Sequence, residues 1–180
     1  MRYTSTAVEG VLIVELEPRA DERGFFARTF DATEFGRHGL DPHVAQANVS
    51  FNHRAGTVRG LHRQVPPHAE GKLVRCTAGA IVDVAVDVRP DSPTHGRHAM
   101  VELSAQNRTA LFVPPYVAHG YQTLVDDTEV VYQVSGPYVP GAEQGFRHDD
   151  EAFAITWPLP VTTISAKDAS WPLVGERVAL

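Results

Sequence analysis

The residues best suited to acid and base chemistry gather between positions 59 and 72 of this 180-residue chain. His62 can act as a general base because an imidazole titrates near neutral pH. Arg59 and Lys72 stand in the same stretch and supply positive charge. A base beside a cation can remove a proton from a carbon next to a carbonyl, while the cation stabilises the enolate oxygen. The stretch therefore predicts an enolising site, with Lys72 or Arg59 serving the oxygen.

Inverting a carbon centre also requires an acid on the face opposite the base. Tyr132 is a candidate because a tyrosine hydroxyl can donate a proton. The base further needs a carboxylate that orients its ring. Asp83, Asp87 and Asp168 are all candidates for this role, and the sequence pattern does not choose among them.

The segment Ile81–Val88 predicts one of the strands that must position these side chains. Its valines alternate with Asp and Ala, which is typical of a strand with one apolar face. The second face carries Asp83 and Asp87, so it should meet either water or a polar pocket.

Two further strands are expected at Thr57–Gln64 and Lys72–Thr77, the segments that carry the base and the cations. Strict alternation puts His62 on the face opposite Arg59. A bulge or twist at Gly60 would bring the two side chains to one face.

The rest of the chain also reads as short segments between turns. The best helix candidate begins after Asp31, because Asp31 and Glu34 have the spacing of a capping box, and it ends at Gly39. Further strands are expected at Val11–Leu16, Phe25–Phe30, Val44–Phe51, His98–Leu103, Ala110–Val113 and Glu129–Val134, with a loop at 135–145 and an irregular tail at 146–180. The pattern predicts an all-β jelly-roll barrel with one or two short helices, in a single domain over residues 1–180.

Composition excludes several classes of protein. A formal net charge of −6 argues against binding to a nucleic-acid backbone. The single cysteine, Cys76, excludes an internal disulfide framework and is expected to be buried and inert. No apolar run approaches the length of a membrane span and the N-terminus carries no export signal, so a cytoplasmic location is expected.

A series of longer motifs runs through nearly the whole chain. DERGFFARTF begins at Asp21, QANVS at Gln46, VRGLHRQVPP at Val58, GKLVRC at Gly71 and DVAVDVR at Asp83; SPTHG, AHGY, VVYQVSGPYVP and S-x-KDA follow. In this order they resemble the motifs of the dTDP-4-dehydrorhamnose 3,5-epimerase family, cupin-like enzymes of deoxysugar biosynthesis. The resemblance implies a cupin-type homodimer that exchanges N-terminal strands and needs no cofactor. Its implied activity is epimerisation of dTDP-4-dehydro-6-deoxy-D-glucose at C3 and C5.

Carried onto this sequence, the resemblance implies a role for each matching residue. His62 is the base and pairs with Asp168, Tyr132 is the acid, and Lys72 lies near the C4 oxygen of the keto sugar. The residues implied along the nucleotide and sugar pocket are Arg23, Gln46, Asn48, Arg59, His119, Tyr138 and Lys167.

Three positions depart from the family pattern. Arg28 stands where close relatives carry Glu, Arg63 where they carry an aromatic residue, and 115–117 (Pro-Tyr-Val) replaces a Glu-Gly-Phe-like run. These replacements are expected to line the approach to the pocket and to affect nucleotide preference and the number of centres inverted.

Three alternative functions follow from the same residues. The first is a mono-epimerase that inverts C3 or C5 only, and the second is a non-catalytic cupin that binds a sugar nucleotide. The third is a metal-dependent cupin oxygenase, whose metal needs two His one residue apart, a Glu and a later His. His62 lacks the neighbouring His and only His119 fits the later position, so no metal is expected.

Overall fold

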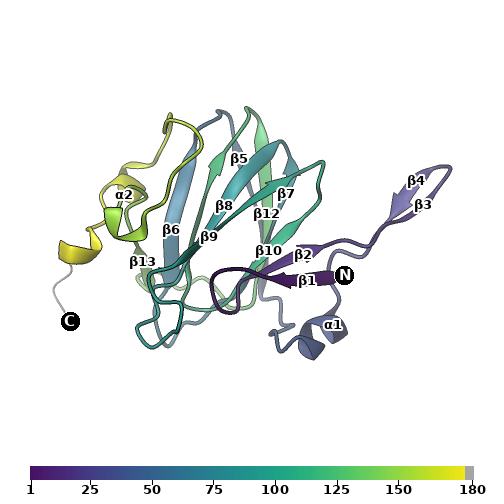
Figure 1. Ribbon diagram of the computed structural model, residues 1–180, viewed down its shortest axis with the longest axis horizontal. Coiled ribbons are helices and arrows are strands. Elements are labelled where there is room, and N and C mark those ends of the chain that lie inside the picture. Colours follow the sequence, from purple (N-terminus) through teal and green to yellow (C-terminus); the bar gives the residue numbers. More distant parts are fainter. Residues whose placement is uncertain (177–180) are drawn as a thin grey trace.

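A computed structural model describes residues 1–176, and Figure 1 shows two β-sheets facing each other with a hairpin projecting to one side. The first sheet has six strands in the order β1-β2-β10-β7-β12-β5, and the second has five in the order β13-β6-β11-β8-β9. Neighbouring strands in both sheets are antiparallel. This is the all-β jelly roll that the sequence predicts.

The strands of both sheets are short. The six-stranded sheet contains β1 (Arg2–Ser5), β2 (Leu12–Glu15), β10 (Ala110–Val113), β7 (Lys72–Ala78), β12 (Thr128–Val134) and β5 (Gln46–Asn52). The five-stranded sheet contains β13 (Glu143–Gly145), β6 (Val58–Gln64), β11 (Ala118–Thr123), β8 (Ala80–Val86) and β9 (His98–Ser104). The remaining elements are β3 (Arg19–Asp21), β4 (Gly24–Phe26), α1 (Ala32–Arg37), α2 (Ala166–Ala169) and the 3-10 turns η1 (Glu151–Phe153) and η2 (Val174–Glu176).

Alternation along the strands builds three apolar layers. In β8, Ala85 joins the cluster between the sheets, whereas Val84 and Val86 pack under Phe146 and Phe153 of the C-terminal segment. On the outer face of the other sheet, Phe35 of α1 covers a third cluster. Because both faces of β8 are buried, the second face of this strand meets the barrel interior instead of water.

The predicted helix is confirmed with its cap. The side chain of Asp31 accepts hydrogen bonds from the backbone amides of Thr33 at 2.9 Å and Glu34 at 3.1 Å. The helix α1 ends at Arg37, shortly before Gly39, whose φ of 71° lies in the left-handed region that favours glycine.

Two expectations about secondary structure are wrong. The strand predicted over Phe25–Phe30 ends at Phe26 and pairs only with β3, forming a hairpin outside both sheets. The segment 135–145 is not wholly a loop, because its last three residues form β13 on the edge of β6. A three-residue edge strand is too short to show a period of two, so the sequence carries no signal for it.

Candidate active site

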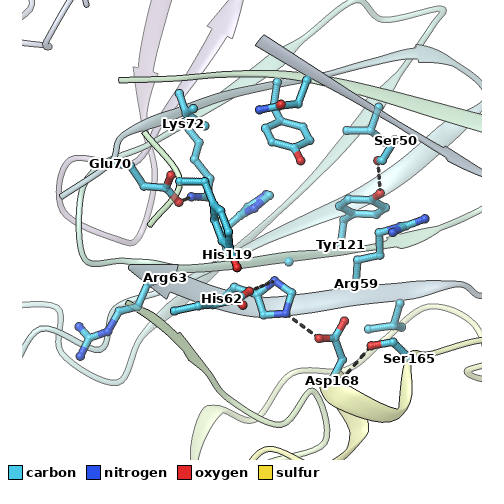
Figure 2. A pocket seen from close by; sticks show the side chains of 18 of the residues that line it. Ser50, Arg59, His62, Arg63, Glu70, Lys72, His119, Tyr121, Ser165 and Asp168 are labelled. Atoms are coloured by element: carbon cyan, nitrogen blue, oxygen red, sulfur yellow. Dashed lines mark hydrogen bonds and ion pairs between the residues drawn. The ribbon is translucent and has the colours of Figure 1, made fainter. Parts of the chain in front are cut away.

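A cavity of about 710 Å³ opens between the two sheets. Strands of both sheets contribute to its wall, and the C-terminal segment closes one side (Figure 2). Nine of the eleven predicted site residues line it: Gln46, Asn48, Arg59, His62, Lys72, His119, Tyr132, Tyr138 and Asp168. The fold thus gathers residues that lie more than 100 positions apart in the sequence.

A bulge at Gly60 puts the base and the arginine on the same wall. Across the strand pair β6–β11, His62 lies opposite His119 and Arg59 opposite Tyr121, so three steps on β6 match two on β11. Gly60 has a φ of 109°, and a Cβ there would lie 2.6 Å from the Cα of Gly120. Only glycine allows this approach, and the bulge foreseen at Gly60 is confirmed.

His62 is held by Asp168, which reaches it from α2. The Nε2 atom of His62 lies 2.6 Å from Oδ1 of Asp168, while Oδ2 of Asp168 accepts a hydrogen bond from the Gly60 amide at 3.2 Å. Ser165 caps the helix by accepting from the Asp168 amide at 3.0 Å. With Nε2–H donating to the carboxylate, Nδ1 carries the lone pair that a base requires.

Asp168 is suited to remain an anion beside this ring. Burial opposes its ionisation, but the hydrogen bond and charge of His62, with the Gly60 amide and the Ser165 hydroxyl, hold its pKa below the usual value. A permanent carboxylate fixes the tautomer of His62 and stabilises the imidazolium that forms when the base takes a proton.

Lys72 and Tyr132 come from the opposite sheet, on the neighbouring strands β7 and β12. The side chain of Lys72 is 13% exposed and contacts the carboxylate of Glu70. Burial lowers the pKa of Lys72 to about 8, although the charge of Glu143 opposes this shift. The cavity therefore has a base on one wall, with an amine and a tyrosine hydroxyl on the other.

The other two candidate carboxylates have different partners. Asp83 is fully buried and its Oδ1 lies 2.7 Å from Nε2 of His119, so it orients the second histidine of the site. Burial raises the pKa of Asp83, and the contact with His119 opposes the shift. Asp87 accepts hydrogen bonds from Arg89 in a loop and does not line the cavity.

Several lining residues escaped the sequence analysis. Glu143 of β13 places Oε1 3.6 Å from Nδ1 of His62, on the side of the ring away from Asp168. Glu70 contacts Lys72, and the side chain of Tyr121 lies deeper in the wall. Nothing in the sequence singles out the two glutamates, because Glu143 lies in a segment expected to be a loop and Glu70 lies just before an expected strand.

Two predicted site residues lie outside the cavity. Arg23 is 82% exposed on the β3–β4 hairpin, where it pairs with Asp21 at 2.6 Å, and Figure 1 shows this hairpin projecting from the barrel. Lys167 is partly exposed at the rim and pairs with Glu143. Arg23 therefore does not reach the cavity of its own chain, because the hairpin that carries it pairs with neither sheet, and its place along the nucleotide pocket stays a prediction.

The departures from the family pattern also fall in different places. Arg63 lines the cavity and donates to the carbonyl of Tyr116 at 3.0 Å, so both positions lie at its edge. Arg28 instead pairs with Asp31 at the start of α1, at 2.9 Å, and does not line the cavity of its own chain. The effect of Arg28 on nucleotide preference and on the number of centres inverted stays a prediction.

The described part of the chain offers neither a metal-binding cluster nor a membrane-spanning helix. Among residues 1–176, no three His, Cys, Asp or Glu side chains come together in a way that could hold a metal ion. The helices of the same residues are all too short or too polar to cross a membrane.

Comparisons of the sequence and of the structure with known proteins point to one family. The sequence profile of the family described as dTDP-4-dehydrorhamnose 3,5-epimerase matches residues 5–176. A protein of that description from Sinorhizobium fredii is 42% identical over 177 residues, covering 98% of this chain and 91% of its own. A dTDP-4-dehydrorhamnose 3-epimerase from Streptomyces niveus is 35% identical, covering 98% and 85%. The crystal structure of a 3,5-epimerase from Bacillus anthracis with TDP and PPi bound superposes with a TM-score of 0.92 at 38% identity, covering 96% and 99%.

Proposed function

This chain belongs to the dTDP-4-dehydrorhamnose 3,5-epimerase family, and we propose that it inverts C3 and C5 of dTDP-4-dehydro-6-deoxy-D-glucose to give dTDP-4-dehydro-L-rhamnose. The observation that carries the proposal is the His62–Asp168 pair, which faces the wall that bears Lys72 and Tyr132 across one cavity. The protein is thus an isomerase on a cupin-type jelly roll. Binding alone would need neither a base nor an acid, which disfavours a non-catalytic cupin.

The proposed reaction is a pair of proton exchanges next to one ketone. His62 removes the proton from C3 or C5, because both carbons flank the C4 carbonyl and share its acidity. Lys72 supports the negative charge on the C4 oxygen, since a largely buried ammonium interacts strongly with an enolate. Tyr132 returns a proton on the opposite face, which inverts the centre. His119, oriented by Asp83 through Nε2, lies opposite the base on β11 and leaves Nδ1 to accept a hydrogen bond from the sugar.

The substrate anion is proposed to bind at the arginine side of the cavity. Arg59 of β6 provides a fixed cation there, while Gln46 and Asn48 of β5 add polar side chains to the lining and Tyr138 adds an aromatic one. This local charge can attract a diphosphate although the whole chain carries −6. Lys167, at the rim, is proposed to approach the nucleotide.

We also propose that two chains associate and that Arg23 serves the cavity of the partner. The β3–β4 hairpin exposes Phe25 and Phe26, and the edge strand β5 exposes Val49 and Phe51. Apolar surface on an unpaired edge strand is costly in a monomer and is typical of an interface. Size-exclusion chromatography with light scattering should give a mass near twice the 19.7 kDa of the chain, and a monomer would contradict the proposal. The single domain over 1–180 and the cytoplasmic location stay predictions.

The function is tested by following protons on the keto sugar by NMR while the purified protein acts in D2O. A 3,5-epimerase should introduce deuterium at both C3 and C5 and give the L-rhamno product. Deuterium at one carbon alone would instead assign a mono-epimerase, a function represented among the relatives by the Streptomyces niveus 3-epimerase. No exchange at either carbon, with the nucleotide sugar still bound, would indicate the non-catalytic alternative. Activity that is unaffected by a chelator would support the prediction that no metal is needed.

A further inference from the structure

Arg59 is an exposed side chain that is nevertheless held at two points. Its Nε donates a hydrogen bond to Oδ1 of Asn52 at 2.7 Å, and its Nη2 donates to the carbonyl of Phe51 at 3.2 Å. Within residues 1–176, its Nη1 has no protein partner. One edge of the guanidinium is thus fixed to β5, and the other edge is left for a ligand.

Asn52 is itself fixed, because it is 2% exposed and uses both ends of its amide. Its Nδ2 donates to the carbonyl of Thr128 at 3.1 Å and to Oη of Tyr121 at 3.3 Å. Tyr121 is in turn 2.7 Å from Oγ of Ser50, and Figure 2 shows its ring beside Arg59. A flipped amide would lose these donors, so the contacts determine which atom faces the arginine.

The anchor of Arg59 is neutral, in contrast to the carboxylates that hold several other arginines of the chain. Arg23, Arg89 and Arg147 contact Asp21, Asp87 and Asp149, respectively. A carboxylate would fix the guanidinium equally well but would cancel its charge. An amide fixes the plane of the group and leaves the charge available to an anion.

We propose that Asn52, fixed by Tyr121, is a positioning residue that preorganises Arg59 for the nucleotide diphosphate. The inference rests on the proposed function, in which Arg59 binds that diphosphate. An unrestrained arginine loses rotamer freedom when it binds a ligand, and this loss weakens affinity. The contacts with Asn52 and Phe51 restrict the side chain before the substrate arrives. They also set the direction of the guanidinium edge that carries Nη1. A positive charge on an unrestrained side chain would not set this direction.

The test is calorimetric titration of the purified protein with dTDP. Asn52→Ala should raise the dissociation constant about 2- to 10-fold, the cost of ordering one flexible side chain. In the keto-sugar assay the effect should fall on KM and not on kcat. In an Arg59→Ala background the same substitution should cause no further loss, because there is no arginine left to position. Asn107→Ala removes an asparagine whose three contacts lie in the β9–β10 turn, and it should leave dTDP affinity unchanged.

An Asn52→Ala effect that is the same with and without Arg59 would overturn the inference, since a general loss of structure does not require the arginine. Should Asn52→Ala fail to fold, Tyr121→Phe removes one contact of Asn52 and keeps the ring; it should weaken dTDP binding only in the presence of Arg59. Asn52→Asp keeps the acceptor but adds a negative charge, so unimpaired dTDP binding in this variant would also contradict the proposal. If Arg59→Ala alone does not weaken dTDP binding, the proposed diphosphate contact itself is wrong.

Discussion

His62 presents two different nitrogen atoms, and their surroundings assign them different roles. Nε2 is engaged by Asp168 at 2.6 Å, whereas the nearest carboxylate oxygen to Nδ1 is that of Glu143 at 3.6 Å. The weaker contact leaves Nδ1 free to exchange a proton with a substrate. After protonation, the imidazolium lies between two carboxylates, and both stabilise its charge.

Substitution of the base and of the acid should separate exchange from inversion. His62→Ala should abolish both turnover and deuterium exchange in D2O, with a loss of at least about 10²–10⁴-fold, which is the usual contribution of a general base. Tyr132→Phe keeps the ring but removes the donor, so His62 can still take a proton and return a deuteron to the same face. NMR should therefore detect deuterium without epimerisation in Tyr132→Phe. Exchange that survives only in His62→Ala would show that the two roles are reversed.

The protonation state of Lys72 is expected to set the upper pH limit of kcat. Burial favours the neutral amine and lowers its pKa from 10.5 to about 8. Because only the ammonium can stabilise the enolate, kcat should fall as the pH rises through about 8. Lys72→Arg should have a lower kcat, because a guanidinium differs in shape from an ammonium. Since arginine keeps its charge at high pH, the alkaline limb of the kcat–pH profile should move upward by more than one pH unit. If the alkaline limb stays at the same pH in this variant, the titrating group is not Lys72.

At the scale of elements, the pairing of β6 with β11 determines where the two histidines lie. Gly60 and Gly120 face each other there, and a Cβ on Gly120 would lie 2.6 Å from the carbonyl oxygen of Arg59. The atom in the way belongs to the backbone, so it cannot rotate aside as a side chain could. The close approach of these two strands is thus part of the active site.

Gly120→Ala should move β6 away from β11 and displace His62 from its partners. We expect a loss of kcat on the order of 10²-fold, because displacements of about 1 Å have that effect on catalytic groups. The melting temperature should also fall. Gly36→Ala is the matched control: its Cβ meets nothing within 4 Å in α1, so it should stabilise the protein by about 0.5–1 kcal/mol and leave kcat unchanged. Normal activity in Gly120→Ala would contradict this account of the close approach of β6 and β11.

At the scale of the whole molecule, a buried carboxylate ties together two loops from opposite sheets. Asp87 is fully buried and accepts from Arg89 at 2.8 Å, Ser92 at 2.5 Å and Thr94 at 2.6 Å. Arg89 also donates to the backbone carbonyl of Glu9. The hydroxyl of Thr94 accepts a hydrogen bond from the backbone amide of Glu9. The loop after β8 is therefore fastened to the loop between β1 and β2.

Asp87→Ala should lower the free energy of unfolding by about 3–5 kcal/mol, because it leaves buried donors and a cation without their partner. Burial opposes the ionisation of Asp87, but Arg89, Ser92 and Thr94 hold its pKa well below the usual 3.8. Since the folded pKa is depressed, the contribution is complete above the unfolded pKa and is lost as the pH falls below about 4. Urea denaturation of both proteins at pH 7 and pH 3 should therefore give a smaller difference at pH 3. An equal difference at both pH values would show that the charge is not the cause.

The sequence by itself determined the local features of this protein. Alternation in Ile81–Val88 predicted a strand, Asp31 predicted the start of α1, and the motifs around His62 and Lys72 predicted the family and its chemistry. These features depend on a few neighbouring residues, whose side chains and backbone preferences act over one strand or one turn. They can therefore be recognised without knowing which strands meet.

Only the tertiary structure decided which groups share a contact. The residue pattern left three carboxylates open for His62, and only the family resemblance pointed to Asp168. The fold places Asp168, 106 positions away, against His62 and gives Asp83 to His119. It also brought Glu143 to the same ring and carried Arg23 away from the barrel. Such contacts depend on strand register and on how the C-terminal segment closes over β6, and shifting a strand by one residue would turn every side chain to the other face. No local pattern in the sequence encodes that register, because it is fixed only when the two sheets pack together.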